Sequence, residues 1–109
     1  MASDITTLLK TIQDGITELA TQSFKEYVKD IGNDSEIIYQ AFKGDIERWS
    51  IEVENGDLSL EDLEFLIKGK KDLIKITVLT QKGAAKIQLD KFKQGVIDLI
   101  FSSIKSVIK

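Results

Sequence analysis

The sequence predicts an all-α protein: an elongated helical bundle of three main helices plus a short helix, with a long C-terminal helix and completion by dimerisation. Three observations predict this fold class. The 109 residues contain no proline, the residue that most often ends helices and fills linkers. Apolar residues recur three or four positions apart along most of the chain, which is the helical period. The hydrophobic share of 42% and charged share of 30% are those of one folded domain, 1–109.

The first helix is predicted over residues 4–31. Ser3 is a suitable N-cap, and the helical apolar pattern continues until Gly32-Asn33, a pair typical of a helix end. Gly15 lies in the interior of this helix, where glycine costs about 1 kcal/mol relative to alanine. It marks either a close crossing of two helices or a tolerated flaw.

The second helix is predicted over residues 35–55. Asp34 or Ser35 can cap its start, and Asn55-Gly56 can close it. Trp49, the only tryptophan, is in phase with the apolar positions of this helix. We therefore expect it to anchor a core or an interface rather than to bind a ligand.

A short third helix is predicted over residues 59–68. Ser59 followed three residues later by Asp62, just before an apolar run, resembles a capping box. One alternative stays open for the preceding segment, because apolar residues also alternate around Asn55-Gly56, the favoured turn of a two-residue hairpin. A β-hairpin over residues 49–60 would satisfy that pattern.

The fourth helix is predicted over residues 71–108 and is the element around which the others pack. Its apolar stripe advances by about 3.7 residues per step, close to the helical period. This constant phase favours one continuous helix over a β-hairpin at residues 74–89, whose β-branched residues and Gly83 turn keep that alternative open. It also remains open whether the third and fourth helices join through the glycine-containing lysine cluster at 68–71.

The end of the fourth helix carries a second apolar row beside the main stripe. A single neighbouring helix cannot cover both rows, so the second row predicts contact with another molecule. The simplest assembly is a twofold-symmetric homodimer, with another protein as the alternative partner. The predicted oligomer interface consists of Ile97, Phe101, Ile104 and Ile108.

The residue types narrow the possible functions. Histidine and cysteine are absent, which removes the commonest acid-base residue, the usual nucleophile pairs and the usual zinc ligands. Carboxylates cluster at Glu61, Asp62 and Glu64, but in a first helical turn they offset the helix dipole. The sequence therefore predicts a non-enzymatic oligomeric interaction or scaffold protein without catalytic residues, metal or cofactor. Because no secretion signal or membrane span is evident, we expect a cytoplasmic location.

Charge is unevenly distributed along the chain. Residues 1–67 carry five basic and fifteen acidic side chains, whereas residues 68–109 carry ten lysines and three aspartates. This asymmetry suggests an alternative function, the binding of an anionic surface such as a nucleic acid or an acidic membrane. We consider cancellation by the acidic helices the better explanation, because the basic residues of this segment are all lysines and Phe92 is the only aromatic residue interleaved with them. The predicted patch consists of Lys68, Lys70, Lys71, Lys75, Lys82 and Lys86.

Overall fold

The computed structural model describes residues 2–27 and 29–107, and within these ranges it contains helices and no strand. The all-α prediction is confirmed. Two 3-10 turns, Lys25–Tyr27 and Lys71–Leu73, interrupt the chain. The described α-helices are α1 (Ala2–Ser23), α2 (Ile31–Glu54), α3 (Leu60–Gly69), α4 (Val78–Gln81) and α5 (Lys86–Val107).

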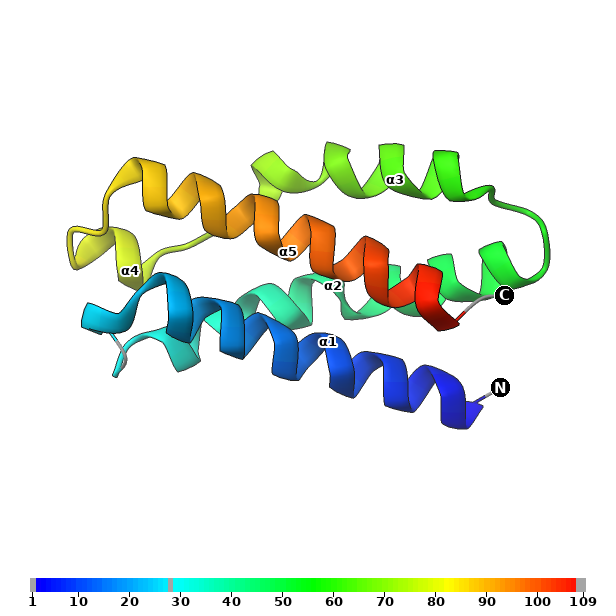
Figure 1. Ribbon diagram of the computed structural model, residues 1–109, viewed down its shortest axis with the longest axis horizontal. Coiled ribbons are helices and arrows are strands. Elements are labelled where there is room, and N and C mark those ends of the chain that lie inside the picture. The colour runs from blue at the N-terminus through cyan, green and yellow to red at the C-terminus, as the bar shows by residue number, and fades with distance from the viewer. Residues whose placement is uncertain (1, 28, 108–109) are drawn as a thin grey trace.

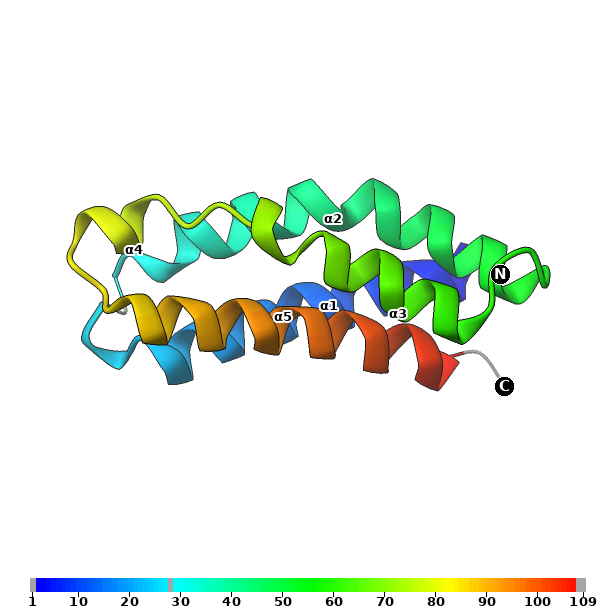
Figure 2. The ribbon, with the colours of Figure 1, turned by 90° about the horizontal axis from the view of Figure 1, so that it is seen from above.

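The four longer helices lie along the long axis of a molecule measuring 43 × 25 × 18 Å (Figure 1). Helix α1 packs against α2 and α5, and α3 lies beside the same two helices on the other side (Figure 2). The core lies between them and is almost wholly aliphatic and aromatic. Its fully buried members include Ile16, Ile46, Trp49, Leu63, Phe92 and Ile100.

The predicted first helix is too long. Helix α1 ends at Ser23, because Phe24 then turns into the core and packs edge-on against Phe92 of α5. The two ring centroids are 5.3 Å apart and the rings are inclined by 78°. After the 3-10 turn, α2 already begins at Ile31. Gly32-Asn33 therefore lies inside α2 and does not end the first helix.

The second and third helices agree with the prediction to within a few residues. Helix α2 ends at Glu54, Asn55 caps it, and Gly56 takes a φ of 83°, which favours glycine. The alternative hairpin over residues 49–60 is wrong, since its first arm belongs to α2 and residues 55–60 form no strand. Ser59 caps α3 as expected, because its hydroxyl accepts a hydrogen bond from the Asp62 amide at 3.0 Å.

The predicted continuous helix over residues 71–108 is wrong. Residues 74–77 are extended, α4 is a single turn, and the chain reverses at Gly83, whose φ is 93° (Figure 1). Burial explains the break, because Ile74 and Ile76 are buried while Lys75 between them is exposed. That period of two requires extended backbone. The hairpin alternative over residues 74–89 is also wrong, since this segment forms no strand.

Gly15 marks a close helix crossing, which settles the question that the sequence left open. A Cβ atom on Gly15 would lie 2.7 Å from Cδ2 of Leu99 on α5. At the next contact the roles are exchanged: a Cβ atom built on Gly95 of α5 would lie 3.5 Å from Cδ1 of Leu19, four residues further along α1. A glycine of each helix thus packs against a leucine of the other, which lets the axes of α1 and α5 come close together.

Candidate functional site

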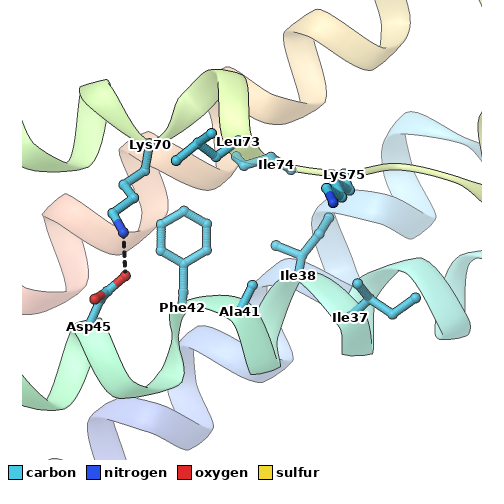
Figure 3. Close-up of a pocket in the computed structure, with 9 residues that line it drawn as sticks. All are labelled: Ile37, Ile38, Ala41, Phe42, Asp45, Lys70, Leu73, Ile74 and Lys75. Carbon is cyan, nitrogen blue, oxygen red and sulfur yellow. Dashed lines mark ion pairs between the residues drawn. The ribbon is translucent and has the colours of Figure 1, made fainter.

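A groove lies between the middle of α2 and the segment that follows α3 (Figure 3). It has a volume of about 350 Å³. Ile38 and Phe42 of α2 form its floor together with Ile74, and all three are buried. Ala41 lies between them along α2, and its small side chain leaves the groove open above it.

Two large apolar residues stand at the mouth of this groove. Ile37 is 44% exposed and Leu73 is 67% exposed, although both line the same hollow. Isolated apolar side chains on a surface are ordinary, but two of them over an apolar floor form a continuous patch. Such a patch is typical of a surface that binds another molecule.

Charged side chains form the rim of the groove. Lys70 Nζ lies 3.1 Å from Asp45 Oδ2, and Arg48 Nη2 lies 2.8 Å from Asp45 Oδ1. Asp45 is thus held by two cations and its side chain is only 15% exposed. Lys75, at the other end of the groove, is exposed and forms no ion pair among residues 2–27 and 29–107. Among the described charged residues of the rim, Lys75 is therefore the one without an ion-pair partner.

Asp34 holds the segment that follows the groove-lining residues Ile74 and Lys75 along the chain. This residue of α2 is 1% exposed, and its Oδ2 accepts a hydrogen bond from the Leu79 amide at 2.8 Å. Its Oδ1 accepts another from the Thr77 amide at 3.3 Å. The two amides belong to the start of α4, so Asp34 caps a helix distant in sequence rather than its own. Residues 74–79 are thereby fixed against α2.

The edge of α3 continues the apolar surface beyond the groove. Leu66 is partly exposed and lies four residues before Lys70, which reaches Asp45 on α2, so Leu66 is on the α2 side of α3. Phe65, next to it, is 78% exposed. We call the surface formed by Ile37, Ala41, Leu66 and Leu73 the α2–α3 face.

The predicted oligomer interface on α5 does not form an exposed surface. Ile97 and Ile104 are buried within the single chain, and Phe101 is half-buried. Ile108 lies outside the described residues. Ile97 and Ile104 are covered because α5 has neighbours on two sides, α1 and α3, whereas one neighbour had been assumed.

The predicted lysine patch is divided between paired and unpaired cations. Lys68 lies 3.7 Å from Glu64, and Lys71 lies 3.4 Å from Asp90, in addition to the Lys70–Asp45 pair. In the part of the chain that the structure describes, the other three predicted lysines form no ion pair. Cancellation by acidic neighbours thus accounts for half of the patch, and binding to an anionic surface stays a prediction.

No group of three or more acidic, histidine or cysteine side chains is placed to hold a metal ion in residues 2–27 and 29–107. Within the same ranges, every helix is too short or too polar to cross a bilayer.

A second hollow, of about 600 Å³, lies between α1 and α2. Lys10, Lys43 and Glu47 contribute much of its lining. It lacks the strongly exposed large apolar residues that distinguish the α2–α3 face.

Sequence reasoning missed the α2–α3 face. A signal was available in α2, where Ile37, Ala41, Gly44 and Ile51 recur at helical spacing on a side away from the core stripe. The other half of the groove could not be found this way, because it depends on how residues 70–75 leave α3.

Comparison of the chain with models of protein families, curated proteins and solved structures found no match.

Proposed function

We propose that this protein is a non-enzymatic interaction module that receives an apolar side chain of a protein partner in the groove between α2 and residues 70–75. The observation that carries the proposal is the exposure of Ile37 and Leu73 over an apolar floor. Burying a side chain of this size contributes about 1.5 to 3 kcal/mol. A partner that covers both would thus gain a substantial part of its binding energy there.

The rim supports a protein ligand that carries negative charge beside its apolar group. Lys75 offers an uncompensated cation, whereas Asp45 is already held by Arg48 and Lys70. Among the described residues that line the groove, Asp45 is the only one with a carboxylate, and this carboxylate is already paired. Charges at a rim act mainly on orientation and association rate, so the apolar contact supplies most of the affinity.

The proposal can be tested with anilinonaphthalene sulfonate, a fluorescent probe that combines an apolar aromatic body with one negative charge. Ala41→Arg places a long side chain over the open part of the groove, and we expect the probe to bind about tenfold more weakly, a change of about 1.4 kcal/mol. Gln40→Arg is the matched control. It adds the same side chain one residue earlier on α2, where Gln40 bonds to Glu36 and does not line the groove.

Equal probe binding by the two variants would refute the proposal. Thermal unfolding followed by circular dichroism must show that both variants stay folded, because the probe also binds loosely packed states. Residues 40 and 41 are both exposed, so neither change should disturb the core.

A further inference from the structure

The groove lies between two acidic residues that share one side of α2. Asp34 and Asp45 are eleven residues apart, which is three helical turns, or about 16 Å. Ile38, Ala41 and Phe42, which line the groove, fall between them along that side of the helix. The two carboxylates therefore stand at the two ends of the groove.

The wall of the groove that faces α2 is a segment tied to these two carboxylates. We call residues 70–79 the strap. At one end Lys70 Nζ lies 3.1 Å from Asp45 Oδ2, and at the other end Asp34 accepts hydrogen bonds from two amides at the start of α4. Residues 73–75, which line the groove, lie between the two ties (Figure 3). The position of the strap therefore sets the width of the groove.

Asp34 supplies the polar attachment of the strap beyond its first residues. In the described part of the chain, the hydrogen bonds that join residues 74–81 to α2 are accepted by its carboxylate. The amides of Lys75 and Ile76 donate no hydrogen bond to a described residue. Loss of the Asp34 bonds thus leaves the strap held by Lys70 and by apolar contacts alone.

The strap has the features of a segment that opens before the rest of the fold. Helix α4 has four residues, too few to be stable alone, and it packs against α2. The apolar residues that the docked strap buries, Ile74, Ile76 and Leu79, lie close together in the chain and leave the core together. Segments with few neighbours open at a lower free energy than the core around them.

We propose that the strap regulates the groove: its docking on Asp34 makes the groove competent to bind the partner, and an occupied groove holds the strap docked. The inference rests on the proposed function and adds its regulation. Asp34 is a positioning residue here, because it does not line the groove but holds the segment that does. Such coupling is reciprocal, so the partner strengthens docking by the factor by which docking strengthens binding.

Hydrogen exchange of the unaltered protein, followed by NMR, tests the coupling. With anilinonaphthalene sulfonate at about ten times its Kd, the amides of Thr77 and Leu79 should exchange about tenfold more slowly, because a ligand that binds only the docked strap suppresses its opening. The Asp57 amide is the control. It donates a hydrogen bond of 2.8 Å to the carbonyl of Glu52, at the end of the bundle opposite α4 (Figure 1). If Thr77 and Leu79 are slowed no more than Asp57, the inference is wrong.

Asp34→Asn tests the same coupling in the other direction. It leaves one strap contact broken, so fewer molecules have a docked strap, and the probe should bind about threefold more weakly or worse. Asp30→Asn is the matched control, because it removes the same charge at the start of α2 where no side-chain cap bond is made. Loss of a negative charge alone would favour the anionic probe, so weaker binding reports the strap. Equal binding by the two variants, both folded by circular dichroism, would overturn the inference.

The Ala41→Arg variant separates this inference from the proposed function. If Ala41→Arg binds the probe as tightly as Gln40→Arg, the groove is not the binding site and the proposed function fails. If Ala41→Arg weakens the probe but Asp34→Asn does not, the groove remains the binding site and only its regulation by the strap is refuted.

Discussion

Replacing Asp34 by asparagine should destabilise the protein far more than its single-atom change suggests. The carboxylate is buried and accepts hydrogen bonds from the amides of Thr77 and Leu79. Asparagine keeps one accepting oxygen but sets an NH₂ group against the second amide, so two donors face each other. The buried side chain can rotate its amide, but either orientation leaves one of these contacts broken.

The distances give the magnitude of the loss. A hydrogen bond to a charged group contributes about 1.5 to 3 kcal/mol, and the bond of 2.8 Å to Leu79 belongs in that range. The bond of 3.3 Å to Thr77 is longer and weaker. We therefore expect Asp34→Asn to lower the free energy of unfolding by about 2 to 3 kcal/mol, a large share of the 5 to 15 kcal/mol typical of a domain.

Urea unfolding provides the assay. Trp49 is buried, so its fluorescence reports loss of the core, and circular dichroism reports loss of the helices. Asp30→Asn is the control, because Asp30 stands at the N-cap of α2 without a side-chain cap bond. It should change the free energy of unfolding by less than about 0.5 kcal/mol. If Asp34→Asn is no more destabilising than this control, Asp34 does not anchor residues 74–79 as described.

Four further substitutions can be measured in the same urea assay. Gly44→Ala should raise the free energy of unfolding by about 0.8 to 1 kcal/mol, because Gly44 is exposed within α2 and has open space around it. Gly15→Ala should give no such gain, because the new Cβ atom would lie 2.7 Å from Leu99. Ser35→Ala should stabilise by about 1 kcal/mol, because the buried Ser35 hydroxyl has no hydrogen-bond partner among the described residues; a loss of stability would contradict this. Ser59→Ala should cost about 1 kcal/mol by removing the cap of α3, and an unchanged midpoint would refute that role.

Local signals in the sequence were enough to predict the helical class and several boundaries. Ser59 with Asp62 predicted the start of α3, and Asn55-Gly56 predicted the end of α2, because caps and turns depend on neighbouring residues alone. Trp49 was expected in a core or an interface and is buried. These features require no knowledge of the rest of the fold.

The break between α3 and α5 could not be predicted in the same way. Asp34 or Ser35 was expected to cap the second helix, but Asp34 accepts hydrogen bonds from the amides of Thr77 and Leu79, which lie more than 40 positions later in the chain. These two hydrogen bonds hold residues 74–77 in an extended conformation and fix the start of α4. The spacing of apolar residues along 71–108 contains no information about hydrogen bonds to Asp34. The alternation of apolar Ile74 and Ile76 with Lys75 is visible in the sequence, but only the tertiary contact decides between the strand-like period of two and the helical period.

The location of the surplus apolar surface follows from the number of neighbours that each helix acquires. Helix α5 carries two apolar rows, but Gly15 and Gly95 let α1 approach it closely on one side while α3 covers the other. Helix α3 is short, and its outward side has no neighbour among the described elements, so Phe65 stays exposed. Counting apolar rows on α5 therefore did not locate the strongly exposed apolar side chains on α3 and at the mouth of the groove, Phe65 and Leu73. Whether an apolar row stays exposed depends on how many neighbours its helix acquires in the fold.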